Sequence, residues 1–257
     1  MYLQADVQHK LWTKEGIAKA RELLKQALEI DPNYIDAWNM LVGTHLVDAR
    51  FGYSDSREGS LQAAEDTVNK ILDLDNTEAR AYGAMGTVHL WRGEHDKAII
   101  SRKKAYTLNP SNSGNIAGLA WAMFASGEPE EALILIKEAM RLNPSYPDWW
   151  LMILEESYRL SGRYDEAIET IHEELRRLDN YFTRTRLALY YSQIGRDEEA
   201  RAEIAKVLQL RPDMNLEIWE KAQFFKNKDW LERDLADLRR VGLPEKASQR
   251  TPTDKEN

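Results

Sequence analysis

The sequence predicts an all-α protein of about six helical hairpins in tandem, and three observations support this prediction. A pattern anchored on alanine recurs with a period near 34 residues. Within each copy, apolar residues recur every three or four positions, as they do on one face of a helix. Proline or glycine stands where helices are expected to end. The 257 residues, 43% of them hydrophobic, are enough to bury a sizeable core.

The repeating pattern places three further residues four, seven and twelve positions after each anchor alanine. The well-formed copies are Ala20, Leu24, Ala27, Pro32; Ala98, Arg102, Ala105, Pro110; Ala132, Ile136, Ala139, Pro144; and Ala200, Ile204, Val207, Pro212. The degenerate copies are Ala64, Val68, Ile71, Asn76 and Ala167, Ile171, Glu174, Asp179. The anchors lie 44, 34, 34, 35 and 33 residues apart. This period is typical of tetratricopeptide repeats, so we expect a right-handed superhelical solenoid.

Each column of the pattern has a physical explanation. The alanine lies where the two helices of a hairpin cross closely, so a larger side chain would separate them. The proline follows the second helix and stops it. Inside a hairpin, glycine ends the first helix in a left-handed conformation, and the candidates are Gly93, Gly127, Gly162 and Gly195. The first helices carry buried stripes that include Trp38 and Leu41, Tyr82 and Met85, Leu119 and Met123, Leu154 and Tyr158, and Leu187 and Tyr191. We therefore expect at least twelve helices and no sheet.

Three regions follow from where the pattern begins and ends. Residues 1–212 hold six repeats, with an insertion near 48–58. The insertion either lengthens the second hairpin or forms a loop, and its aromatic residues either pack on adjacent helices or contact a partner. Residues 213–245 carry two shorter helical stripes, which we expect to be C-terminal capping helices over the last apolar face. Residues 246–257 are polar and are predicted to form a disordered tail.

Several segments extend the similarity beyond a generic repeat. The stretches AMRLNPSYPDWWL, LSGRYDEAI and SQIGRDEEARAEIAKVLQLRPD resemble the tetratricopeptide region found downstream of bacterial class III adenylate/guanylate cyclase domains. The ending FFKNKDWLERDLADLRRVGLPE, the opening helix and the insertion FGYSDSREGS are also similar, so the resemblance covers nearly all of residues 1–245. Glu155 departs from it, because that family tends to have a small residue there. The resemblance implies the regulatory or interaction half of such a protein, or a free-standing relative, without the cyclase domain.

Composition and motifs argue against catalysis, cofactors and nucleic-acid binding. Acidic residues outnumber Lys and Arg by 43 to 35, whereas nucleic-acid surfaces need clustered basic side chains. We find no cysteine, P-loop, dinucleotide-binding turn or nucleophile elbow, and the five histidines form no metal-binding pair. No apolar run is long enough for membrane insertion, and the N-terminus lacks a secretory signal. We expect a cytoplasmic, non-enzymatic protein without cofactor or metal.

Two functions fit these expectations. The first is a protein–protein interaction scaffold that binds a peptide or partner domain in its concave groove, in a bacterial signalling context. The alternative is a structural or oligomerisation module that orients a fused or partner cyclase-type catalytic domain, with self-association as one route. A carboxylate clamp for chaperone C-termini is not expected, because small residues occupy its first-helix positions, namely Gly83, Ala84, Thr87, Ala117 and Gly118.

The partner-binding surface is expected on the first helices in the middle of the repeats. Residues that lie off the buried stripes are predicted to contact the partner, namely Trp91, Trp121, Phe124, Trp149, Met152, Arg159, Phe182 and Arg186. Aromatic side chains supply contact area with little rotamer entropy to lose, and the two arginines would bind a carboxylate of the ligand. Alternatively, these side chains fill the space between a helix and the helix of the next repeat.

Overall fold

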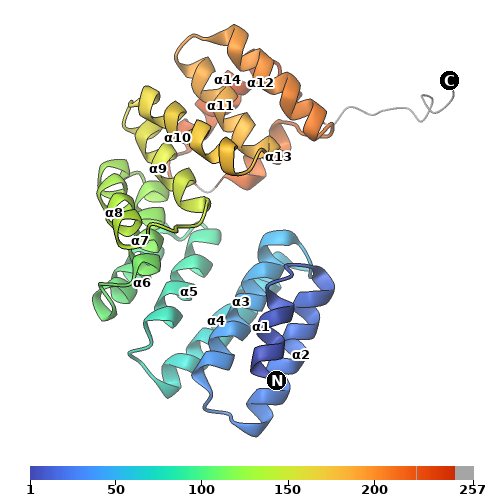
Figure 1. The fold of residues 1–257 in the computed structure, drawn as a ribbon, viewed down its shortest axis with the longest axis vertical. Coiled ribbons are helices and arrows are strands. Elements are labelled where there is room, and N and C mark those ends of the chain that lie inside the picture. The colour runs from blue at the N-terminus through green and yellow to red at the C-terminus, as the bar shows by residue number, and fades with distance from the viewer. Residues whose placement is uncertain (224, 247–257) are drawn as a thin grey trace, which may run out of the picture. The chain divides into compact units, whose positions relative to one another are not determined.

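The chain is helical throughout the part that the computed structural model describes, residues 1–223 and 225–246, and these residues form no strand (Figure 1). The helices are α1 (Tyr2–His9), α2 (Lys14–Ile30), α3 (Ile35–Phe51), α4 (Arg57–Leu74), α5 (Ala79–Trp91), α6 (His95–Leu108), α7 (Ser113–Ser126), α8 (Pro129–Leu142), α9 (Trp149–Leu160), α10 (Tyr164–Arg177), α11 (Tyr181–Gln193), α12 (Asp197–Leu210), α13 (Leu216–Ala222) and α14 (Lys228–Arg240). Neighbours in sequence pack as hairpins, α1 with α2, α3 with α4, α5 with α6, α9 with α10, and α11 with α12. The prediction of at least twelve helices and no sheet is confirmed for these residues.

The helices form two compact units, residues 1–122 and residues 123–257, with the boundary inside α7. Both units are built on the same repeating columns. All six anchor alanines are completely buried, namely Ala20, Ala64, Ala98, Ala132, Ala167 and Ala200. The predicted hairpin glycines all have positive φ, between 74° and 101°, namely Gly93, Gly127, Gly162 and Gly195. The repeat positions predicted from the sequence therefore coincide with the buried helix crossings and the hairpin turns of the structure.

The insertion near 48–58 lengthens the second hairpin. Its helices α3 and α4 have 17 and 18 residues, compared with 13 and 14 in α5 and α6. Gly52 ends α3 in the left-handed conformation, with φ 68°. Phe51 stacks on Tyr53 and meets Trp12 edge to face, while the Tyr53 hydroxyl donates to the Trp12 carbonyl at 2.8 Å. Of the two readings, aromatic packing on a neighbouring segment is the one that the structure shows.

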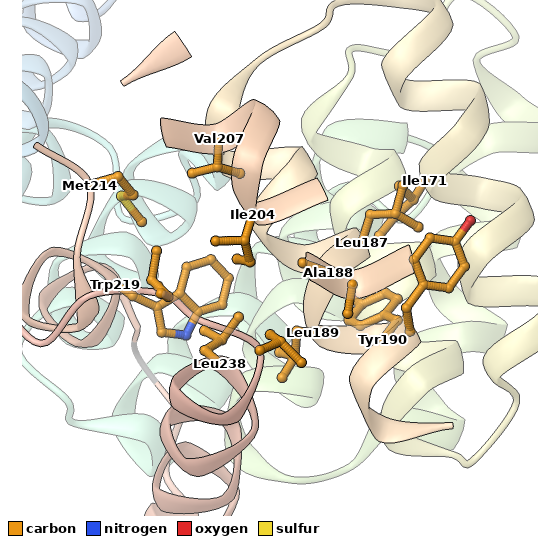
Figure 2. Packing of buried hydrophobic residues seen from close by; sticks show 14 of the residues in the cluster. Ile171, Leu187, Ala188, Leu189, Tyr190, Ile204, Val207, Met214, Trp219 and Leu238 are labelled. Atoms are coloured by element: carbon orange, nitrogen blue, oxygen red, sulfur yellow. The ribbon is translucent and has the colours of Figure 1, made fainter. Parts of the chain in front are cut away.

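Helices α13 and α14 pack on the last hairpin of the second unit. Trp219 of α13 is 1% exposed and lies among Leu189 of α11, Ile204 of α12 and Leu238 of α14 (Figure 2). This arrangement covers apolar side chains of α11 and α12, as expected of terminal helices in a repeat array. The capping role of residues 213–245 stays a prediction. Residues 247–257 of the predicted tail lie outside the described residues.

Enlarging an anchor alanine should weaken the hairpin that contains it. We expect Ala132→Leu to lower the free energy of unfolding by about 1–3 kcal/mol, because the added side chain must force α8 away from the helix it crosses. Urea denaturation measures the change. Ile134→Leu supplies the control, because Ile134 lies on the same helix and is 69% exposed. An unchanged midpoint for Ala132→Leu would show that the register is assigned wrongly at this position.

Candidate functional site

Two of the predicted partner-binding residues form an aromatic pair in the first unit. Trp91 ends α5 and Trp121 lies on α7, and both side chains are half-buried. Their rings meet edge to face, with centroids 6.4 Å apart and planes at 73°. This geometry is favourable for aromatic pairs because the electron-poor edge of one ring meets the electron-rich face of the other. The pair is a direct contact between α5 and α7.

The predicted residues of the second unit differ in exposure. Trp149 of α9 is 38% exposed, and Met152 on the same helix is half-buried. Phe182 of α11 is half-buried, and its ring centroid lies 5.0 Å from that of Trp219. Phe124, in contrast, is 1% exposed and packs edge to face on Phe225. The side chain of Phe124 therefore belongs to the interior of this unit.

Arg159 of α9 also lies in the interior of the second unit, where it is 1% exposed. Its Nε and Nη2 donate to the same oxygen of Glu156, at 2.9 and 2.8 Å. Its Nη1 donates to Asp234 of α14 at 2.9 Å, and Gln193 donates to that carboxylate oxygen at 3.0 Å. The guanidinium thus ties α9 to α14, and its charge is satisfied by carboxylates of the protein.

Arg186 of α11 is 3% exposed and is paired in the same way. Its Nη2 donates to Glu174 of α10 at 2.5 Å, and its Nε lies 2.5 Å from Oε1 of Glu155 on α9. Thr183 donates a further hydrogen bond to Glu174 at 2.9 Å. Glu155, which departs from the resembled family, and Glu174, which departs from the apolar column, are therefore partners of one buried arginine.

These pairings correct the expectation that Arg159 and Arg186 bind a ligand carboxylate. Periodicity placed both residues off the buried stripe of their own helix, but it could not show that another helix covers them. Their charges are neutralised by acidic residues that lie on other helices or one turn away. Phe124, Arg159 and Arg186 are therefore interior residues of the second unit.

The buried cluster of the second unit contains more acidic than basic groups. Glu155, Glu156, Glu174 and Asp234 share the two guanidinium groups of Arg159 and Arg186. Burial raises the pKa of Glu155 well above its usual value, and the neighbouring carboxylates of Glu156 and Glu174 add to this effect against the attraction of Arg186. Burial also raises the pKa of Asp234. Both groups are therefore harder to ionise in the folded unit than in the unfolded chain.

A third buried arginine has a different environment, in the first unit. Arg102 of α6 is 9% exposed and occupies the column four residues after an anchor alanine. The other five repeats have a buried aliphatic residue in this column, namely Leu24, Val68, Ile136, Ile171 and Ile204. Within the described residues Arg102 forms no ion pair, and the hydrogen bond from its Nη2 to Thr87 Oγ1, at 2.6 Å, is the one that its guanidinium makes.

Glycines on the two flanking helices make room for this side chain. A Cβ at Gly86 of α5 would lie 2.7 Å from Cγ of Arg102, and a Cβ at Gly118 of α7 would lie 2.9 Å from its Cζ. At Gly83 of α5 a Cβ would be 3.6 Å from Nη1. An alanine at position 86 or 118 would therefore clash with Arg102. We call Arg102, Thr87 and these three glycines the Arg102 site.

The charge of Arg102 persists at neutral pH. Burial lowers the pKa of its guanidinium to about 10, and no neighbouring charge contributes to this shift. A signal for this residue was present in the sequence, since Arg102 is a charged residue in a column that is otherwise aliphatic. A repeat pattern identifies residues that match its columns, so it does not by itself predict a site at a residue that departs from one.

The described residues contain no group of three or more His, Asp or Glu side chains placed to hold a metal ion. No helix among them has the length and apolar character needed to cross a membrane. A surface cavity of about 420 Å³ lies between α8 and the turn after α9, and its lining includes Lys137, Ser161 and Arg163. It contains no arrangement of side chains typical of catalysis.

Two segments of the chain match models described as tetratricopeptide repeat, over residues 151–180 and 183–214. They correspond to the hairpins α9/α10 and α11/α12. The chain carries tetratricopeptide repeats. Proteins with these repeats generally mediate protein–protein interactions, and the fold is typically a non-catalytic scaffold.

The chain is also similar to a curated relative and to solved structures. The transcriptional regulator HilA of Salmonella typhimurium is 27% identical over 204 residues, which are 78% of this chain and 36% of HilA. The chain thus spans about a third of the length of that relative. A chain in the solved structure of the APC/C hetero-tetramer Cut9–Hcn1 is 18% identical, with a TM-score of 0.68. The alignment covers 87% of this chain and 40% of that chain. YrrB, described as a TPR protein with an unusual peptide-binding site, matches 75% of this chain and 94% of its own at 18% identity, with a TM-score of 0.51.

Removing one member of the buried ion pairs should destabilise the second unit. We expect Arg159→Met to cost about 3–5 kcal/mol in the free energy of unfolding, because Glu156 and Asp234 would remain buried without their partner. Chemical denaturation followed by circular dichroism measures this loss. Arg163→Met is the matched control, since Arg163 and its partner Glu166 are both more than 40% exposed and surface pairs contribute little. Equal stability of the two variants would contradict the role assigned to Arg159.

The excess of buried carboxyl groups should make the stability of the second unit depend on pH. A carboxyl group whose pKa is raised by folding stabilises the fold below its unfolded pKa, and this contribution is lost as pH rises through the folded pKa. For Glu155 the loss begins above its ordinary value of 4.5. We therefore expect Glu155→Gln to gain stability relative to the unmodified protein as pH is raised from about 5 to 8. Glu198→Gln, on an exposed residue of α12, leaves the cluster intact and is the control. A difference in urea midpoint that stays constant over this range would contradict the prediction.

Proposed function

We propose that this protein is an interaction scaffold of a bacterial signalling system that binds a peptide or partner domain along α5 and α7. The observation that carries the proposal is the half-buried pair of Trp91 and Trp121 on these two helices. The pair lies about one helical turn from small residues on the same helices, Thr87 on α5 and Gly118 on α7. Tryptophan is enriched among the residues that contribute most to binding at protein interfaces.

The relatives support a role in binding. YrrB has the same fold and is described by its peptide-binding site. HilA is a transcriptional regulator in which the matching region is about a third of the protein, which supports the idea that these repeats serve as a module in regulatory proteins. Trp149, Met152 and Phe182 remain candidates for a second contact surface on the second unit. The cytoplasmic location expected from the sequence stays a prediction.

An alternative function is a module that orients a fused or partner cyclase-type catalytic domain. The observation behind this alternative is that the chain matches one part of a longer regulator. Self-association would be one way to perform it. Light scattering distinguishes the two functions in part, because a monomer across the working concentration range would contradict orientation by self-association.

Loss of the tryptophan pair should weaken partner binding without unfolding the protein. The probe is a set of peptides selected by the unmodified protein from a random display library, with affinity measured by calorimetry. We expect Trp91→Ala and Trp121→Ala each to weaken binding by about tenfold or more, because interface tryptophans contribute about 2 kcal/mol or more. Ile100→Ala is the control, since Ile100 lies on α6 and is 68% exposed. Binding that survives the double substitution would place the surface elsewhere, with the segment Phe51–Tyr53 as the next candidate.

A further inference from the structure

The Arg102 site combines two features that are unfavourable for the stability of a repeat. An unpaired charge stands in a column where five other repeats have a buried aliphatic side chain, and burying a charge without an acidic partner costs free energy. Three glycines stand within the helices α5 and α7 around it, and glycine is a poor residue for a helix interior. A sequence that departs from local stability rules in this concerted way is expected at functional positions.

The buried arginines of the second unit show how this fold neutralises such a charge. Arg159 and Arg186 are each held by two carboxylates of the protein. In contrast, Arg102 has the hydroxyl of Thr87 as its hydrogen-bond acceptor, and its Nε is buried without an acceptor in the described part of the chain. The missing component of the Arg102 site, by comparison with the other two arginines, is a carboxylate.

We propose that Arg102 is an anion-recognition residue whose guanidinium binds a carboxylate of the peptide or partner that lies along α5 and α7. The inference rests on the proposed function and adds the chemistry of the ligand to it. Guanidinium and carboxylate are both planar, and two parallel N–H···O bonds join them in a fixed orientation. The close approach that the three glycines permit brings this guanidinium up to the backbone of α5 and α7, the helices that carry the tryptophan pair.

The neighbouring side chains define the ligand further. Trp91 follows Thr87 by four residues on α5, and Trp121 follows Gly118 by three on α7, so each tryptophan lies about one helical turn from the Arg102 site. A matching ligand therefore presents a carboxylate next to an apolar or aromatic side chain. This arrangement differs from a clamp built from first-helix side chains, because Arg102 comes from α6, the second helix of its hairpin, and its side chain lies against the glycines of α5 and α7.

The test uses Arg102→Ile, which restores the aliphatic residue of the other repeats. We expect this variant to fold with an unfolding midpoint equal to or above that of the unmodified protein, since an unpaired charge is removed. A lower midpoint would show that Arg102 has a structural role and would count against the proposal. Arg102→Lys is the second variant, because it keeps the charge and loses the planar fork. It is expected to bind as weakly as Arg102→Ile.

The probe for binding is a random peptide library displayed with free C-termini. The unmodified protein should select peptides that carry a carboxylate beside an apolar residue, and Arg102→Ile should bind them at least about tenfold more weakly. Two arms distinguish the source of the carboxylate. Amidation of the C-terminus abolishes binding if the terminal carboxylate is recognised, and replacement of Asp or Glu by Asn or Gln abolishes it if a side chain is recognised. Equal binding by both proteins would overturn the inference and leave the proposed function standing.

A second measurement, of the unfolding temperature, tests the Arg102 site without any peptide. Sodium glutarate should raise the unfolding temperature of the unmodified protein above its value in sodium chloride of equal ionic strength, because a ligand that binds the folded state stabilises it. The same salt should leave Arg102→Ile unchanged relative to the chloride control. An equal response of the two proteins would overturn the inference. If glutarate distinguishes them but no peptide is bound, the carboxylate site stands and the proposed function fails.

Discussion

The close crossing of two helices at a buried alanine is the constraint on which the rest of this structure depends. Each of the six anchors is completely buried, and its small side chain allows the two helices of a hairpin to approach closely. The residues four and seven positions later then face the same crossing and are buried with the alanine. Because these three columns are determined by helical geometry, they recur in every repeat, and the positions around them are free to vary.

Charged residues in the core columns differ in whether the protein supplies a partner for their charge. In the second unit Glu174 lies in a core column, and the fold supplies Arg186 and Thr183 as its partners. In the first unit Arg102 lies in a core column, and among the described residues the neighbouring helices supply glycines and a threonine but no carboxylate. A paired charge in the interior fixes which helices pack together, as Arg159 does for α9 and α14. A charge without its partner favours a ligand that provides one.

Repeat architecture makes such local specialisation possible without a change of fold. Each hairpin contacts mainly its neighbours, so the energetic effect of an unusual residue stays within one or two repeats. The third repeat can therefore carry an arginine and two glycines, and the first helix of the fourth repeat a third glycine, while the flanking repeats keep aliphatic columns. The second hairpin likewise accommodates longer helices, because the added turns pack on their own aromatic residues and on Trp12.

The sequence by itself determined the number of hairpins, the anchor alanines and the left-handed glycines, because these features depend on helical period and backbone conformation within about 34 residues. It also contained the departures at Arg102, Glu155 and Glu174. Only the tertiary structure decided what these charges do. Arg159 meets Asp234, which lies 75 residues away in the chain, and Arg102 meets glycines of two other helices. Periodicity assigns a residue to a face of its own helix, whereas burial and pairing depend on which other helix covers that face, and that is decided by packing.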